Sequence, residues 1–194
     1  KILRLLEKYH VQATFCMIGC EAKASPKLAK AVVTQGHHLA NHTFTHPLSL
    51  PFMPLHRIRR EIDRTQDAVA TATGIAPHLF RSPGGNWGPQ IYRELGYHAL
   101  VPLDWDVDPR DWSEPGTSAI VQAMLAARPG DIILCHDGGG DRSQTYAALK
   151  TVIPQLRARG LNFVTLPTRR EVSGNTGWWR LGACLICPRR PRPA

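Results

Sequence analysis

The sequence predicts an α/β protein with a parallel sheet and helices outside it. Two features of residues 1–167 favour this class: segments with apolar residues at helical spacing alternate with short apolar, strand-like runs, and the connections between them are short. Strict alternation of this kind predicts a parallel sheet, either open or closed as a barrel. We expect one domain over residues 1–167, followed by an Arg- and Pro-rich tail over residues 168–194 that is not packed on it.

Six helices are expected from apolar positions three and four residues apart. Ser25-Pro26 is typical of a helix start, because a capping side chain precedes a proline whose fixed φ suits the first turn. Gly36 and Gly74 are typical of residues that follow a helix end. The expected helices occupy residues 1–9, 26–35, 55–73, 90–95, 120–125 and 144–159.

Six strands are expected between these helices and after the last one, each as a short apolar run bounded by turn residues. They occupy residues 13–18, 37–41, 78–81, 99–103, 131–135 and 161–166. An opening helix in such folds normally follows a strand, so one further strand is expected ahead of Lys1.

Composition argues against several kinds of partner. Six arginines and one acid from Arg169 onward contribute +5 of the net charge of +9, and no basic stripe interleaved with aromatic residues precedes them. Nucleic acid is therefore not an expected partner. No apolar run is long enough to span a bilayer. Five cysteines form no complete disulfide framework, and Cys184 and Cys187 lack the second pair of a zinc ribbon. The oligomeric state stays open.

Two histidines four residues apart, His42 and His46, form the first candidate site. They follow an expected strand, and Pro47 prevents a helix from continuing through them, so they lie on a rigid loop. Neutral imidazole is a good zinc ligand, and such a pair could share one metal ion. Ordinary polar loop histidines are the alternative, and His38 with His42 has the same spacing.

Further polar residues follow other expected strands. In parallel α/β folds functional groups gather where strands end, so these residues are expected on one face. Simpler alternatives exist: Arg81 could form a surface ion pair, and His136 could be a satisfied core residue. Asp104, Asp106 and Asp108 could cap turns. The tryptophans could be core or could stack on sugar rings. The set comprises Arg81, Trp87, Asp104, Trp105, Asp106, Asp108, Asp111, Trp112 and His136.

The motifs carried by these residues resemble, in order and spacing, those of the NodB-type polysaccharide deacetylases, a family of carbohydrate esterases. His-Thr-x-x-His, Arg-x-Pro-x-Gly, Asp-x-x-Asp-Trp and Leu-x-His begin here at His42, Arg81, Asp108 and Leu134. The resemblance spans residues 1 to about 167. It implies a distorted (β/α) barrel of about seven strands, of which the first is lacking here.

The resemblance also implies roles. His42 and His46 would be two of three protein ligands of a divalent metal, commonly zinc, which would polarise the acetyl carbonyl of an acetylated polysaccharide. His136 would be the general acid, Asp111 would orient it, and Arg81 would pair with the general-base carboxylate.

Substrate-binding roles are implied for four further residues. Trp112 and Leu134 would shape the acetyl pocket. Pro83 and Gly84 belong to the substrate-binding stretch, where Gly84 replaces a frequent tyrosine and keeps its N–H for the oxyanion.

The family's opening Asp-Asp motif, which supplies the base and the third ligand, is not present in this sequence. Three hypotheses follow: a deacetylase represented by an N-terminally truncated sequence, a glycan-binding relative without catalysis, or a catalytically impaired fragment. Two histidines without that motif are expected to bind metal weakly and to turn over little, unless Asp137 or Asp104 substitutes. Chitin, peptidoglycan and acetylxylan all stay open as substrates. A secreted or cell-envelope location is expected.

Overall fold

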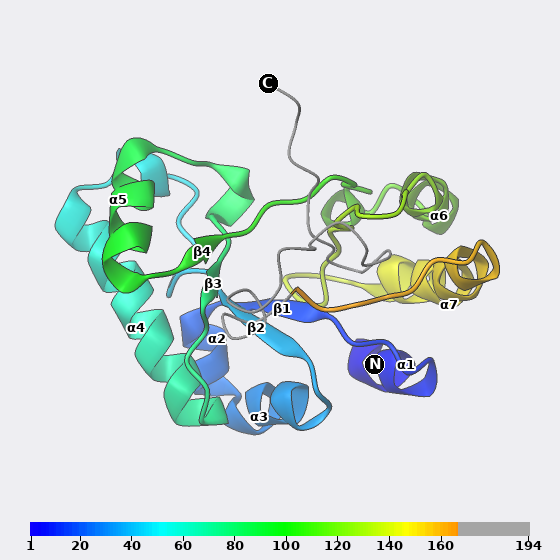
Figure 1. Cartoon of the computed structure of the whole chain (residues 1–194), viewed down its shortest axis with the longest axis horizontal. Helices are drawn as coiled ribbons and strands as arrows, with labels where there is room; N and C mark the ends of the chain where they lie inside the picture. The colour runs from blue at the N-terminus through cyan, green and yellow to red at the C-terminus, as the bar shows by residue number, and fades with distance from the viewer. Residues whose placement is uncertain (167–194) are drawn as a thin grey trace, which may run out of the picture. The chain divides into compact units, whose positions relative to one another are not determined.

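The computed structural model describes residues 1–166, which form two compact units (Figure 1). The sheet unit comprises Thr14–Asp104, and the helical unit, as far as it is described, comprises residues 1–13 and 105–166. The predicted tail over residues 168–194, including Cys184 and Cys187, lies outside the described residues. Each unit is considered by itself below.

The sheet unit contains a parallel sheet in the order β1-β2-β3-β4. Met17 pairs with Asn41, and Asn41 in turn pairs with Phe80, which lies opposite Pro102. Because the strands are parallel and in register, the residues that follow them lie along the same edge of the sheet. The strands are β1 (Thr14–Met17), β2 (His38–Asn41), β3 (Leu79–Phe80) and β4 (Val101–Pro102).

Four helices and two short 3₁₀ turns complete the sheet unit, and α4 and α5 pack together in Figure 1. A fully buried cluster joins the turn before α4, both helices and the sheet; its members are Leu50, Ile58, Ile62, Phe80, Ile91, Leu95 and Leu100. The elements are α2 (Gly19–Ala24), α3 (Pro26–Thr34), η1 (Leu50–Phe52), α4 (Leu55–Thr73), η2 (Pro83–Gly85) and α5 (Pro89–His98).

Helix α2 was not predicted. Gly19 was expected to end the strand, whereas it begins a helix that packs against α4. A Cβ at Gly19 would lie 2.6 Å from Cδ2 of Phe44 and 2.9 Å from Cα of Thr65, so the absence of a side chain permits this close approach. Six residues with one apolar turn give too weak a periodicity to be recognised.

The helical unit consists of three helices and a 3₁₀ turn, with α6 and α7 side by side (Figure 1). Their apolar faces supply its buried side chains, among them Leu6, Ile120, Met124, Leu149, Ile153 and Leu156. The elements are α1 (Ile2–Lys8), η3 (Asp111–Ser113), α6 (Thr117–Leu125) and α7 (Ser143–Ala158).

Two predicted strands of the helical unit are not formed. Residues 131–135 form isolated bridges, with Val107 parallel to Ile133, and residues 161–166 have no regular secondary structure. Leu161 and Leu166 are nevertheless buried, as their apolar pattern indicated. The α/β class with a parallel sheet is confirmed, with four strands in the part of the chain that the structure describes. No helix within residues 1–166 is long and apolar enough to cross a membrane.

Candidate active site

The first cluster of predicted site residues lies on the loop that follows β2. The loop continues the pairing with the chain after β1: His42 N–H donates to the Met17 carbonyl (3.0 Å), and the carbonyl of Thr43 accepts from Gly19 N–H (2.9 Å). On the other side, Arg81 N–H donates to the Asn41 carbonyl (2.9 Å). The loop is therefore held between the ends of its two neighbouring strands.

Asn41 organises this loop from inside the sheet, and sequence reasoning did not identify it. Its fully buried amide donates to the Ile62 carbonyl and to Oε1 of Gln66, both at 3.0 Å, while its Oδ1 accepts from Thr43 N–H at 3.0 Å. The side chain thus satisfies polar groups of α4 and of the histidine loop together.

Glu61 of α4 is a second residue that sequence reasoning missed. Its Oε2 accepts from the N–H groups of Phe44 and Thr45 (both 2.8 Å), and its Oε1 accepts from Thr45 Oγ1 (2.9 Å). Charge-assisted bonds to backbone N–H groups are stronger than neutral ones. An acid placed between Ile58 and Ile62 on the apolar face of the helix was the signal that could have found it.

The backbone of the histidine loop is strained. Thr43 has φ of 64° and His46 has φ of 58°, a left-handed conformation that is costly for a β-branched residue. The Thr43 hydroxyl accepts from His46 N–H (3.1 Å) and donates to the His42 carbonyl (2.6 Å). These two bonds close the loop on itself and hold both histidines in place.

The ring of His42 has a defined orientation. Its Nδ1 lies 2.7 Å from the Arg81 carbonyl, which can only accept, so Nδ1 carries the proton and Nε2 carries the lone pair. The Nη2 of Arg81 donates to that Nε2 at 3.2 Å. The ring of His46 packs edge-on against His42, with 4.7 Å between centroids.

These two imidazoles fit two positions of a divalent metal. A ligating histidine normally donates its other ring N–H to a carbonyl or carboxylate, as His42 does to Arg81. A metal at Nε2 would take the place of the hydrogen bond from Arg81. Within residues 1–166, no group of three or more His, Cys, Asp or Glu side chains is arranged to hold a metal.

The second cluster lies in the helical unit and is centred on Asp111, whose side chain is fully buried. Asp111 Oδ1 accepts from Nδ1 of His136 at 2.7 Å, and Oδ2 accepts from the backbone N–H of His136 at 2.8 Å. The carboxylate therefore fixes both the backbone and the ring of His136, and it leaves Nε2 as the ring atom that can exchange a proton.

Two residues of α7 and the turn before it support Asp111, and sequence reasoning missed both. The hydroxyl of Thr145 donates to Asp111 Oδ2 (2.8 Å). The guanidinium of Arg142 donates to the carbonyls of Asp111 (3.0 Å), Gly138 (3.0 Å) and Gly139 (2.9 Å), and so ties the glycine loop to the turn that carries the acid. Thr145 lies on the apolar face of α7, which was the available signal.

Burial alone would raise the pKa of Asp111, because it penalises the charged form. The hydrogen bonds from the ring and backbone of His136, with that from Thr145, outweigh burial and hold the pKa below its ordinary value. Asp111 is thus an anion at neutral pH, and it stabilises positive charge on the neighbouring imidazole.

The remaining predicted site residues are distributed over both units. Pro83 is buried in η2, and Gly84 is exposed there with φ of 62°, a conformation that glycine adopts without strain. In the helical unit, Leu134 is buried and the Trp112 ring is half exposed beneath the guanidinium of Arg110.

The three aspartates expected to cap turns behave differently from one another. Asp108 caps a turn, since its Oδ1 accepts from Arg110 N–H at 2.8 Å. Asp106 instead joins two segments, because it accepts from Ile132 N–H at 3.0 Å. Asp104 accepts from the indole of Trp87.

Comparison with known proteins decides the family. The sequence profile of the polysaccharide deacetylases matches residues 1–100, just over half of the chain. The chain belongs to the polysaccharide deacetylase family. It is 36% identical over 176 residues to a peptidoglycan-N-acetylglucosamine deacetylase of Bacillus cereus, which covers 86% of this chain and 78% of the relative. It is 39% identical over 181 residues to a chitooligosaccharide deacetylase of Rhizobium leguminosarum bv. trifolii, over 86% of this chain and 83% of the relative.

A solved structure of this polysaccharide deacetylase family is also similar. The family 4 carbohydrate esterase from Streptomyces lividans, in complex with acetate, matches with a TM-score of 0.77 and 34% identity over 82% of this chain and 81% of that chain. The resemblance inferred from the four motifs is therefore confirmed, as is the enzyme class to which they point.

Proposed function

We propose that this polysaccharide deacetylase is a metal-dependent hydrolase that removes acetyl groups from an N-acetylated glycan of chitin or peptidoglycan type. The relatives named as deacetylases of chitooligosaccharides and of peptidoglycan N-acetylglucosamine support the substrate class. Because polymers of this kind lie at or outside the cell envelope, we further propose a secreted or envelope-associated location.

The observation that carries the proposal is the pairing of Asp111 with His136. Deacetylation of an amide must deliver a proton to the departing amine nitrogen as the C–N bond breaks. A histidine whose Nδ1–H is held by a buried carboxylate presents Nε2 for that transfer and has its protonated form stabilised by the neighbouring charge. His136 has this arrangement.

The histidine loop has the complementary task of binding metal. His42 offers the lone pair of Nε2, and His46 packs against it on a backbone fixed by Thr43. A divalent metal, zinc being the expected one, would supply Lewis acidity toward the acetyl carbonyl when bound. Arg81, which donates to His42 Nε2, would exchange that bond for a contact with an anionic group on metal loading.

Acetate release from a chitooligosaccharide and from peptidoglycan fragments, with and without added zinc, tests the proposal. We expect zinc-dependent release that is lost in His136→Ala. The readout is the ratio of the acetate-release rates of wild type and variant, so the test does not depend on the absolute rate of turnover. Release that persists unchanged in His136→Ala would contradict the proposed chemistry. Oligosaccharide binding without acetate release under any metal condition would favour the glycan-binding alternative.

A further inference from the structure

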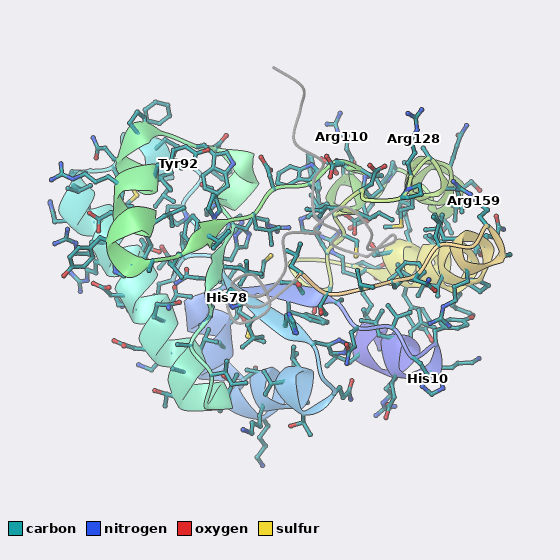
Figure 2. The ribbon with its side chains drawn as sticks, viewed as in Figure 1. His10, His78, Tyr92, Arg110, Arg128 and Arg159 are labelled. Carbon is teal, nitrogen blue, oxygen red and sulfur yellow. The ribbon has the colours of Figure 1, made fainter. Side chains whose placement is uncertain are left out.

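Three aromatic rings in the sheet unit form a ladder from the core to the surface. Phe80 of β3 is fully buried, and the Trp87 ring packs edge-on against it with 6.0 Å between centroids. Tyr92 lies on α5 (Figure 2). Its ring stacks on Trp87 at 5.3 Å between centroids, with an interplanar angle of 19°. Tyr92 is still 52% exposed, so one ring face lies on Trp87 and the other faces solvent.

Polar contacts fix the ladder in place. The indole N–H of Trp87 donates to Oδ2 of Asp104 at 3.3 Å, which orients the ring against which Tyr92 stacks. Phe80 belongs to the buried cluster that also contains Ile91, the neighbour of Tyr92 in sequence. The exposed face of Tyr92 is therefore preorganised, because ordering it on binding would cost little additional side-chain entropy.

Trp87 belongs to the loop after β3, which packs on the loop after β2, and both loops carry residues of the candidate site. The amide of Asn86 donates to the Leu48 carbonyl (3.1 Å), and a Cβ on Gly88 would lie 3.2 Å from Cβ of Pro51, so the loop after β3 packs on the loop after β2. Those loops also hold Arg81 and His46. The ring on which Tyr92 stacks, Trp87, thus belongs to the same loop as Arg81, and this loop packs on the loop that carries His46.

We infer that the exposed face of Tyr92 is a stacking subsite for a sugar of the N-acetylated glycan, beyond the unit that is deacetylated. The identity of the ligand rests on the proposed function. The apolar face of a pyranose ring packs on aromatic rings, and tyrosine adds a hydroxyl that can bond to sugar hydroxyls. The subsite selects for chain length, because a short oligosaccharide cannot occupy it and the reaction centre together.

Binding and turnover of a disaccharide and of a pentasaccharide of β-linked N-acetylglucosamine test this inference. Trp87 provides the binding signal, because a sugar stacked on Tyr92 changes the indole environment. In Tyr92→Ala we expect the pentasaccharide Kd and KM to rise about tenfold, equivalent to about 1.4 kcal/mol, with disaccharide turnover unchanged. Tyr92→Phe keeps the ring and is expected within about twofold of wild type, since an exposed hydroxyl contributes little.

Tyr97→Ala is the matched control. Tyr97 lies on the same helix and is 71% exposed, but its ring already carries the guanidinium of Arg59 at 4.6 Å. Its removal should leave pentasaccharide binding unchanged. Thermal melting of each variant shows whether α5 stays folded. If Tyr92→Ala does not fold, Tyr92→Leu, which keeps an apolar side chain on Trp87 but has no ring, decides the inference by the same loss of pentasaccharide binding.

The outcomes separate the subsite from the proposed function. Equal pentasaccharide binding by wild type and Tyr92→Ala overturns the subsite, even if acetate release is intact. Binding that depends on Tyr92 in a protein that releases no acetate supports the subsite and contradicts the proposed function. Tyr92-dependent self-association, detected by sedimentation, would assign the face to a second copy of the chain and overturn the inference.

Discussion

His42 in the sheet unit and His136 in the helical unit are both held through Nδ1, but by different partners. The acceptor for His42 is the neutral carbonyl of Arg81, and the acceptor for His136 is the buried carboxylate of Asp111. A carbonyl fixes the tautomer and leaves the lone pair on Nε2, which suits a metal ligand. A carboxylate also stabilises the protonated ring, which suits a general acid. The partner, more than the histidine, determines the chemical role.

The two clusters also differ in what makes them rigid. In the histidine loop, Asn41 and Glu61 bond mainly to the backbone, and the rings follow from the loop conformation. In the Asp111 cluster, side chains bond to the functional carboxylate itself. Substitutions in the first cluster should therefore disturb metal binding through geometry, whereas those in the second should disturb proton transfer directly.

Replacing the proton-carrying ring should give the largest effect. His136→Ala is expected to lower kcat for acetate release by about 10²- to 10⁴-fold, the usual contribution of a general acid. Zinc affinity, measured by calorimetry, should not change. His98→Ala, which removes a mostly buried imidazole paired with Asp63 in the sheet unit, is the control. A matching loss of zinc affinity in His136→Ala would break the proposed division of roles.

Removal of either loop imidazole should weaken metal binding further. His42→Ala and His46→Ala are each expected to weaken zinc affinity by at least about 100-fold, since even residues behind a ligand contribute about 10- to 100-fold. His38→Ala tests the other histidine pair of the same spacing and should bind zinc as wild type does. If His38→Ala loses zinc affinity as strongly, the metal is bound by His38 and His42 and not by His42 and His46.

A smaller effect is expected from Thr145, whose hydroxyl donates to Asp111. Thr145→Val removes one donor from a buried carboxylate and should lower the free energy of unfolding by about 1–3 kcal/mol. It should also reduce kcat several-fold without altering KM. Denaturant titration and steady-state kinetics measure both. Thr145→Ser keeps the hydroxyl and should restore kcat; failure of this rescue would indicate a packing effect only.

The smallest effect is expected from acid, which should remove the contribution of the Asp111 carboxylate to stability. Because the pKa of Asp111 is lowered in the folded protein, its contribution to stability is fully present above the ordinary value of 3.8 and is lost as pH falls through the lowered value. Melting temperatures of wild type and Asp111→Asn should therefore converge in that acidic range. Parallel curves at all pH values would show that the carboxylate is not paired as described.

The sequence predicted most of the elements because periodicity is a local property, and the helix that ends at Gly74 illustrates this. It failed at Gly19, where a close approach between helices decided the structure, and at residues 161–166, which are apolar but form no regular strand. The site residues were predicted from motifs at strand ends. Glu61 and Thr145 were missed because their importance lies in which backbone or carboxylate they contact across space, and one sequence does not show that.

The contact of Glu61 with the histidine loop has a consequence for hydrogen exchange. The amides of Phe44 and Thr45 donate to the Glu61 side chain and not to a carbonyl of a strand or helix. Their protection from hydrogen exchange therefore depends on α4 holding that carboxylate in place. Glu61→Gln should let both amides exchange faster while the neighbouring amide of His42, bonded to the Met17 carbonyl, keeps its rate. The exchange rates of these two amides therefore measure how firmly the loop that carries His42 and His46 is held.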